Sequence, residues 1–429
     1  GGGIGGLTLA LAIQRFCDMS QLDVHIYEAA SQFSQIGAGI NIWGRVHQVF
    51  NDLGLEADLA SLLRADDIGC EHWISLVARL HSPSVSDFTC RKSDQAEGKT
   101  FRDVYIENGR MMMLHRAEVQ DLLLKHISPA IKIHLSHRLD DYSHNNQAAE
   151  SIEMRFRGGQ VAHCDLLIAA DGVHSVVRPI FLSNLAEQLD KPELKDALAP
   201  VFSGSNVYRA LVAPEQLEDV WQGHPVMKKP FIYCGKDKHV VAYPISCGRA
   251  INVVAFYTDM SKEDTPFEGS QIGQATTEQV LKTYEGWEPE VRAILSCMRD
   301  PSHWAIITQK PLDVWAADGV FLLGDSAHAM ATHLGAGAGQ AIEVSISCGS
   351  LFSTPLISHR TPTFSRESSR ASRRRAPLQF SPPRPRHSTT GSDRRSPTSC
   401  PHARNFRTAS TSSTRRALIS GHCRRTRLS

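Results

Sequence analysis

Residues 1–6 of the chain read GGGIGG, a G-x-G-x-x-G pattern with Gly1, Gly3 and Gly6 in its three key places. An apolar run, residues 7–13, follows directly and has the composition of a buried helix. Glycine allows a tight turn and lets backbone N–H groups approach a pyrophosphate at the N-terminus of a helix. We therefore predict a dinucleotide-binding turn at this place.

A carboxylate downstream supports this prediction. Residues 22–28 (LDVHIYE) form an apolar run that ends in an acid, as a buried strand would, and Glu28 lies 22 residues after Gly6. A carboxylate there accepts a hydrogen bond from a ribose 2′-hydroxyl and disfavours a 2′-phosphate. The strand that should precede Gly1 is missing, so a glycine-rich turn followed by a surface acid is the alternative.

Two further motifs each place an acid after a buried strand. Residues 164–178 read CDLLIAADGVHSVVR, and residues 320–328 read VFLLGDSAH. The second is followed by GAGAGQ at residues 335–340, where a helix starting near Gly337 would direct its positive end at developing negative charge. Taken alone, the first motif could be only a strand, a turn and an N-capped helix.

The composition indicates a folded protein. The chain has 429 residues, 41% hydrophobic and 21% charged, which are ordinary values for a chain with a sizeable core. No run of 18 apolar residues occurs, so we expect a soluble, cytoplasmic protein that does not enter membranes. The ten cysteines form no C-x-x-C pair, which predicts free thiols and no metal site.

Residues 346–429 differ from the rest. They contain 17 Arg, no Lys and two acidic residues, a net charge of +15, whereas residues 1–345 have −14. This Arg-, Ser- and Pro-rich segment cannot bury a core, and it has almost no aromatic residues for stacking on bases. We expect a disordered tail that binds no nucleic acid. Arg without Lys is typical of a shifted reading frame in GC-rich DNA, so we expect an aberrant frame.

Further elements can be placed from periodicity. Residues 45–54 and 116–127 have helical spacing, and residues 131–135, 152–156 and 161–169 are strand-like. Short β-like runs follow at residues 206–212, 239–245 and 251–257. They predict a second, mostly antiparallel sheet, entered through a polar crossing at residues 182–199.

In this order, the three motifs resemble those of the FAD-dependent aromatic hydroxylases, the single-component flavoprotein monooxygenases, and most of all salicylate hydroxylase-like members. The resemblance covers roughly residues 1–345. It implies an α/β fold: a Rossmann-like FAD-binding domain of the GR2 type with an inserted, mostly antiparallel β-sheet substrate domain. The first strand and the C-terminal helices would be missing.

The resemblance also implies a division of the chain. Residues 1–180 would form the first part of the FAD-binding domain and contribute segments to the substrate side. Residues 181–305 would form the substrate-binding sheet domain, and residues 306–345 would return to the FAD-binding domain. Residues 346–429 would be the tail.

The family's cofactor residues can be carried over one by one. Glu28 would bind the adenosine ribose of FAD, Arg116 would contact the flavin, and Asp325 would hold the ribityl or pyrophosphate region. Backbone N–H groups at the start of the last helix would stabilise the negative charge of reduced flavin near N1 and O2. The cofactor-binding residues implied are Gly1, Gly3, Gly6, Glu28, Ala38, Gly39, Arg116, Asp171, Asp325, Gly337 and Ala338.

The implied reaction uses FAD, with NAD(P)H as co-substrate, and O2. Asp171 and Arg178 would serve both FAD and the nicotinamide cofactor, and no second G-x-G-x-x-G occurs. A C4a-hydroperoxyflavin would deliver oxygen to a small aromatic acid or phenol, from which water must be excluded. The oligomeric state stays open.

The substrate side is less clear from the residues. Arg209, in the strand-like run 206–212, could pair with a substrate carboxylate, since guanidinium matches carboxylate in a bidentate way. Tyr233 and Tyr243 are candidates to orient or deprotonate a phenol, with Tyr233 slightly preferred, although either could be only a strand aromatic. His333 lies in the flavin loop, where an exposed loop residue is an equal alternative.

Two departures from the family pattern leave alternatives. Thr332 stands where many members have Pro, and the long helix expected after Glu343 gives way to the aberrant segment. A catalytically dead product of a truncated or frameshifted gene is therefore one alternative to an active hydroxylase. A flavin epoxidase of the same fold, acting on a non-aromatic lipid, is another.

Overall fold

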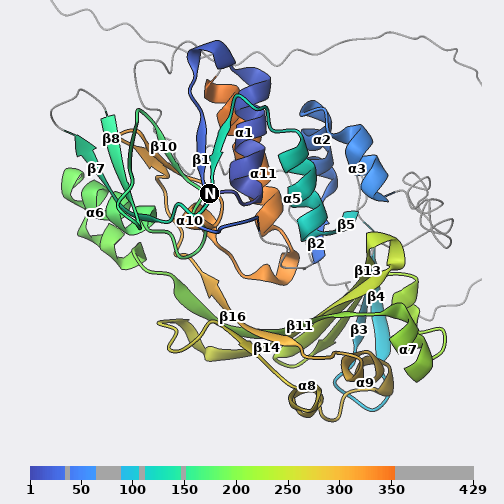
Figure 1. Ribbon diagram of the computed structural model, residues 1–429. Helices are drawn as coiled ribbons and strands as arrows, with labels where there is room; N and C mark the ends of the chain where they lie inside the picture. Colours follow the sequence, from blue (N-terminus) through green and yellow to red (C-terminus); the bar gives the residue numbers. More distant parts are fainter. Residues whose placement is uncertain (34–38, 64–87, 106–111, 146–150, 353–429) are drawn as a thin grey trace, which may run out of the picture. The chain divides into compact units, whose positions relative to one another are not determined.

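The computed structural model describes residues 1–33, 39–63, 88–105, 112–145 and 151–352, which all lie in one compact unit, residues 1–375 (Figure 1). A second unit, residues 376–429, falls outside the described residues. The helices are α1 Ile4–Phe16, α2 Gly44–Asp52, α3 Glu56–Leu63, α5 Arg116–Lys125, α6 Val177–Gln188, α7 Pro214–Val220, α8 Thr277–Thr283, α9 Pro289–Ser296, α10 Asp325–His328 and α11 Gly337–Phe352.

The strands of the described residues fall into five sheets. Three of them are small: β1 (His25–Tyr27) with β6 (Lys132–His134), β2 (Gly39–Ile42) with β5 (Met112–His115), and β7 (Leu139–Asn145), β8 (Ser151–Phe156) and β9 (Val161–Cys164) together. A fourth has the order β10 (Leu167–Ala169), β18 (Val320–Leu322) and β17 (Ala316–Ala317). The fifth has eight strands in the order β15 (Ile272–Gln274), β16 (Ser302–Thr308), β11 (Val201–Val212), β14 (Ala250–Thr265), β13 (Lys238–Ile245), β12 (Phe231–Gly235), β3 (Phe88–Lys92) and β4 (Lys99–Val104).

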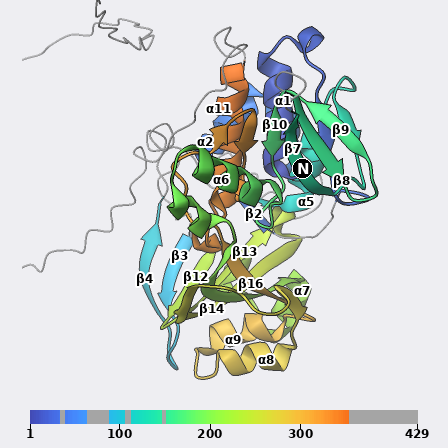
Figure 2. The same cartoon turned by 90° about the vertical axis from the view of Figure 1, so that its left-hand side faces the viewer.

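Helices α1 and α11 pack closely although they lie at opposite ends of the described residues. The Ser345 hydroxyl donates to the Gly5 carbonyl oxygen at 2.9 Å. A Cβ atom on Gly349 would lie only 2.5 Å from that of Ala12, so glycine is required for this approach. The close contact sets the start of α1 beside the middle of α11, where the Cβ position of Gly5 is 3.3 Å from the Cβ atom of Ala341 (Figures 1 and 2).

The parallel strands β10 and β18 explain why two motifs meet. Both are short and apolar, with Leu167 paired to Val320 and Ala169 paired to Leu322. Parallel strands bring their carboxyl ends to the same edge of a sheet. Asp171 and Asp325 follow these two strands, so the motifs that contain them lie at the same edge.

The eight-stranded sheet confirms the predicted, mostly antiparallel sheet. Every pairing in it is antiparallel except that of β12 with β3. Alternation along β11 sends Tyr208 and Val212 into a core shared with α8 and α9, which cover one face (Figure 2). The opposite face, defined by Val207, Arg209, Val241, Tyr243 and Val254, is called the Arg209 face below.

Two expectations from the sequence need correction. The run 161–169 is not one strand, because the chain leaves the β7–β8–β9 sheet after Cys164 and enters another at Leu167. Helix α11 does not end at residue 345. It continues to Phe352. Cys348 is buried in a core with Leu9 and Ile13, so the side of α11 that faces α1 is apolar beyond residue 345 as well.

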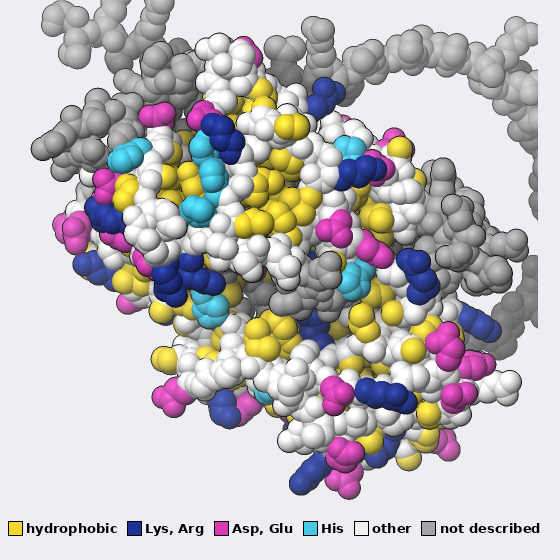
Figure 3. Space-filling view, in the orientation of Figure 1, with side chains coloured by type: hydrophobic (Ala, Val, Ile, Leu, Met, Phe, Trp, Pro, Cys, Tyr) yellow, Lys and Arg dark blue, Asp and Glu magenta, His cyan; other side chains and the backbone are white. Residues whose placement is uncertain are grey.

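The face drawn in Figure 3 shows little segregation of charge. On the face shown in Figure 3, acidic and basic side chains lie intermingled. Among the helices that the structure describes, none is both long enough and apolar enough for a membrane span. In the same part of the chain, no group of three or more His, Cys, Asp or Glu side chains could hold a metal ion.

Candidate functional site

The three motifs converge at one place. A Cβ atom on Gly1 would lie 2.0 Å from the Ala170 carbonyl oxygen, so the glycine-rich turn lies directly on the end of β10. The Ser326 hydroxyl donates to the Ala169 carbonyl oxygen at 2.6 Å and ties the Asp325 motif to the same strand end. Segments far apart in sequence thus form one edge.

The glycine pattern has separate physical reasons at its three key places. A Cβ atom on Gly6 would lie 2.0 Å from the Gly1 carbonyl oxygen, so Gly1 and Gly6 permit close packing of turn and helix. Around Gly3, the N-cap of α1, no atom lies within 4 Å of the Cβ position. The first N–H groups of a helix have no partner within it. The turn therefore presents uncovered donors to an anion.

Glu28 has a role in the turn that the sequence did not reveal. One carboxylate oxygen accepts a hydrogen bond from the Gly2 N–H at 2.7 Å, and the other accepts one from the Ala30 N–H at 2.9 Å. The side chain thereby fixes the glycine-rich turn against the end of β1. A carboxylate has lone pairs to spare, so a ribose hydroxyl could still donate to it.

Asp171 and Arg178 hold the motif together from within. The Asp171 carboxylate accepts from the Val176 N–H at 2.9 Å and so caps α6. Arg178 is fully buried and donates to four backbone carbonyl oxygens, those of Ala197, Lys310, Ser326 and Ala327. Its guanidinium cannot reach a cofactor. The motif's arginine therefore positions the neighbouring Asp325 segment.

Asp325, Arg116 and Arg209 form an electrostatic group. Asp325 is exposed at the start of α10, where surrounding protein raises its carboxyl pKa and the Arg116 cation opposes that effect. Burial lowers the pKa of the Arg209 guanidinium, and Arg116 lowers it further. Tyr243, which lies on the Arg209 face, raises the pKa of Arg209. These side chains come from α10, α5 and the large sheet.

Gly39 joins strand β2 to the large sheet. Ala38 lies outside the described residues. The Gly39 N–H donates to the Asn252 side-chain oxygen at 3.2 Å. A Cβ atom on Gly39 would lie 2.5 Å from the Tyr243 hydroxyl oxygen. Glycine is therefore needed here because β2 approaches β13 and β14 so closely.

The start of α11 completes the group. Gly337 is its first residue, and no atom lies within 4 Å of the Cβ position of that glycine. Ala338 follows in the first turn. Gly335, at φ 57°, brings the preceding loop against Asn41, whose buried side-chain oxygen has no hydrogen-bond partner among the described residues. The space beside the first residue of α11 is thus open.

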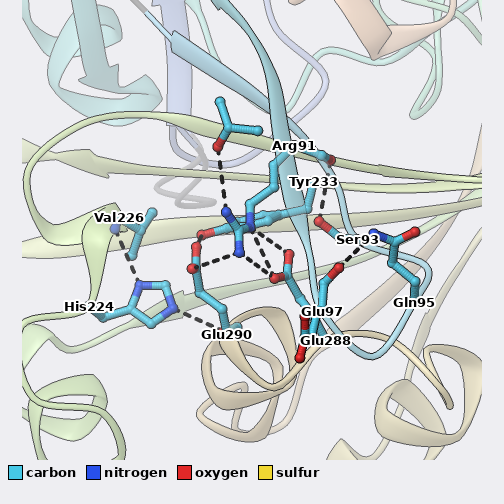
Figure 4. A network of polar contacts seen from close by, with 10 residues as sticks. Arg91, Ser93, Gln95, Glu97, His224, Val226, Tyr233, Glu288 and Glu290 are labelled. Carbon is cyan, nitrogen blue, oxygen red and sulfur yellow. Dashed lines mark hydrogen bonds and ion pairs between the residues drawn. The ribbon is translucent and has the colours of Figure 1, made fainter.

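The geometry does not support the preference for Tyr233. Its side chain is fully buried on the α8–α9 face of the sheet and its hydroxyl donates to Glu290 at 2.9 Å. Glu290 and Glu288 both pair with Arg91, in a network that Figure 4 shows. Tyr243 lies on the Arg209 face instead. The two tyrosines sit on adjacent strands, but alternation along each strand decides the face.

A ring cluster on the Arg209 face escaped the sequence analysis. His239 stacks on Phe256 with ring centroids 4.4 Å apart, and His333 lies over both at 5.2 and 5.1 Å. His333 belongs to the loop before α11. The available signal was the pairing of residues 239–245 with residues 251–257. The even-numbered residues of the second run lie on the same face as His239, but the hairpin register must be known before this can be inferred.

Comparison with known proteins decides the family. A family model described as an FAD binding domain matches residues 1–357. The chain belongs to this FAD-binding family. A salicylate hydroxylase of Pseudomonas putida is 30% identical over 349 residues, 80% of this chain and 73% of the relative. A 6-methylsalicylate 1-monooxygenase of Aspergillus terreus is 31% identical over 358 residues, 82% of this chain and 73% of the relative.

A solved structure agrees with this assignment. A salicylate hydroxylase substrate complex has a TM-score of 0.67 and 27% identity, covering 83% of this chain and 79% of that one. The predicted resemblance, fold class and FAD cofactor are therefore confirmed. The protein is a flavoprotein oxidoreductase of the monooxygenase class, similar to salicylate hydroxylase. Two uncovered helix starts, at Gly3 and Gly337, fit an anionic dinucleotide such as FAD.

The ring cluster of this monooxygenase makes its stability depend on pH. Burial lowers the pKa of His239 to about 4, and His333 acts in the same direction. The unfolded chain therefore takes up this proton first, at pH values near 6.5. The stabilisation is complete above that pH and is lost as the pH falls toward 4.

We expect the decrease in the free energy of unfolding between pH 7 and pH 5 to be about 2 kcal/mol smaller in His239→Gln than in the unsubstituted protein. Urea unfolding of both proteins at the two pH values measures this difference. Equal decreases would show that His239 is not buried in its neutral form.

Proposed function

We propose that this monooxygenase uses NAD(P)H and O2 to hydroxylate a small aromatic acid or phenol, with FAD as cofactor. The main support for this proposal is the environment of Arg209. Its guanidinium is partly buried on the face that meets the flavin-binding strands, with Arg116 nearby, and it has no carboxylate partner among the described residues. A cation withdrawn from water is costly unless an anion pairs with it. The carboxylate of an aromatic acid supplies that anion.

The Arg209 face has the other properties that such a ligand needs. Val207, Val241 and Val254 offer apolar contact to a ring, and Phe256 and the two histidines border it. Burial raises the pKa of Tyr243 to about 12, so its hydroxyl keeps its proton at neutral pH. We propose Tyr243, rather than Tyr233, as the group that donates a hydrogen bond to the bound acid or phenol.

The chain's own residues would hold FAD at the shared edge. We propose that the turn of Gly1, Gly3 and Gly6 receives the pyrophosphate and that Glu28 receives the adenosine ribose. Arg116, Asp325, Gly39 and the backbone of Gly337 and Ala338 would surround the flavin half. Asp171 would support the site through α6. Bound FAD supplies the electron transfer from NAD(P)H and the activation of O2.

We also retain the division of labour along the chain as a proposal. Residues 1–180 and 306–345 would provide the FAD-binding part. Residues 181–305 would provide the substrate face, to which β3 and β4 add two strands from the first part. Closing such a face over the ring excludes water from the reaction.

The test compares FAD binding and turnover in one set of samples. The purified protein should contain non-covalent FAD and should oxidise NAD(P)H faster with salicylate than without it. Asp325→Ala should lower FAD retention strongly, because a charged acceptor beside Arg116 is lost. Stimulation by an apolar alkene but not by salicylate would favour an epoxidase. Full FAD retention in Asp325→Ala would refute the role given to that carboxylate.

A further inference from the structure

One hairpin of the large sheet makes two polar contacts with β2 and α5, two elements of the proposed FAD-binding part. It consists of β13 and β14 and the turn Ser246–Gly248 between them. The first contact is that of the Gly39 N–H with the Asn252 side-chain oxygen at 3.2 Å. The second is at the turn, where the Ser246 hydroxyl donates to the two carboxylate oxygens of Glu118 at 3.1 and 3.3 Å.

Both contacts reach elements that position Arg116. Gly39 is paired with His115 across the β2–β5 ladder, and Arg116 is the next residue and the first of α5. Glu118 accepts a hydrogen bond from the His115 N–H at 3.3 Å and so caps the same helix. A shift of the hairpin would therefore be transmitted to the start of α5.

The Asn252 contact lies beside the proposed substrate face. Asn252 is paired with Tyr243 across β13 and β14, and both side chains are almost fully buried. The Cβ position of Gly39 is 2.5 Å from the Tyr243 hydroxyl oxygen and 2.9 Å from Cγ of Asn252. No side chain separates β2 from the hairpin, so the backbone of β2 follows the position of these two residues.

We propose that Asn252 is a positioning residue: it fixes the backbone of β2 against the Arg209 face and so couples occupation of that face by an aromatic acid to the flavin-binding strands. This inference rests on the proposed function. A ligand that contacts Arg209 and Tyr243 also restricts the position of their neighbour Asn252. The hydrogen bond to Gly39 then holds β2, and through His115 the start of α5, in one arrangement.

Three substitutions of Asn252 separate the effect of its hydrogen-bond acceptor from the effect of its side-chain volume. Asn252→Ala removes both, and Asn252→Leu keeps the volume without the acceptor, which serves if the alanine variant does not fold. Asn252→Asp keeps an oxygen that can accept from Gly39. Asn206→Ala is the matched control, because Asn206 lies on β11 with its side chain on the α8–α9 face.

Three measurements are made on the FAD-loaded protein. Hydrogen–deuterium exchange follows the backbone amides of residues 39–42 with and without salicylate. Stopped-flow absorbance follows flavin reduction by NADH with and without salicylate, and a titration of flavin absorbance gives the Kd of salicylate.

We expect salicylate to slow amide exchange at residues 39–42 and to accelerate flavin reduction in the unsubstituted protein and in Asn206→Ala. In Asn252→Ala and Asn252→Leu, these amides should exchange at least about tenfold faster, which corresponds to about 1.4 kcal/mol. The acceleration by salicylate should fall by a similar factor, while the Kd changes less than about threefold. Asn252→Asp should recover most of both effects.

Unchanged exchange at residues 39–42 in Asn252→Leu would overturn the inference, whatever the enzyme's activity. A tenfold rise in Kd with intact acceleration would also overturn it, because Asn252 would then only bind substrate. Failure of the proposed function is distinct: the unsubstituted protein itself would not bind salicylate.

Discussion

Replacing Arg178 by methionine should lower the free energy of unfolding by about 3–5 kcal/mol, because four carbonyl oxygens, all buried or partly buried, lose their donor at once. Their distances to the guanidinium nitrogens are between 2.7 and 3.0 Å. Burial lowers the pKa of Arg178 to about 10, so it is still charged at neutral pH and its hydrogen bonds are charge-assisted. Urea unfolding followed by circular dichroism measures the loss.

Arg155→Met is the matched control for this prediction. Arg155 pairs with Asp141 and Glu153 on the surface, with its side chain 48% exposed, so its removal should cost less than about 1 kcal/mol. Arg178→Lys should fold but should bind FAD at least about tenfold more weakly, since lysine cannot hold Ser326, Ala327 and Lys310 together. Similar losses in Arg178→Met and Arg155→Met would contradict the positioning role.

Arg209→Met should keep FAD and weaken the binding of an aromatic acid. Losing a charged hydrogen-bonded pair at a buried site costs about 2–5 kcal/mol, roughly 30-fold to several thousand-fold in Kd. The stimulation of flavin reduction by salicylate should disappear at the same concentrations. Titration of flavin absorbance with salicylate measures the Kd.

The rival interpretation, that Arg209 ties the sheet to an acidic neighbour, makes the opposite prediction. Under it, Arg209→Met would bind salicylate normally and would lose stability. A second ligand sharpens the comparison, since a neutral phenol without a carboxylate should bind the variant and the unsubstituted protein alike. A normal Kd for salicylate in a folded, FAD-loaded variant would eliminate the anchoring role.

The meeting of the three motifs at one edge was predictable because its signals are local. The glycine pattern, the acid after each strand and the helix start at Gly337 depend on a few neighbouring residues, and each recurs at the shared edge. What each side chain does was less predictable. Arg178 was expected near the cofactors, yet its four acceptors come from segments far along the chain, and no local pattern contains them.

The substrate half depended on register. Strand alternation was visible for residues 206–212, but the face on which each residue lies follows from pairing with β14 and from the helices α8 and α9. A shift by one residue exchanges the two faces. For this reason Tyr233 and Tyr243 could not be distinguished from sequence. Segments of residues 1–180 were expected on the substrate side, but the strands that join the sheet, β3 and β4, could not be named.

The contact between α1 and α11 also sets a time order for making the protein. The hydrogen bond between Ser345 and Gly5 spans 340 residues. At synthesis rates of about 5–20 residues per second, α1 leaves the ribosome roughly 20–70 s before its partner helix exists. Its apolar side, with Leu9 and Ile13, lacks that cover for the whole interval. The packing of α1 against α11 is therefore completed only at the end of synthesis of the described residues.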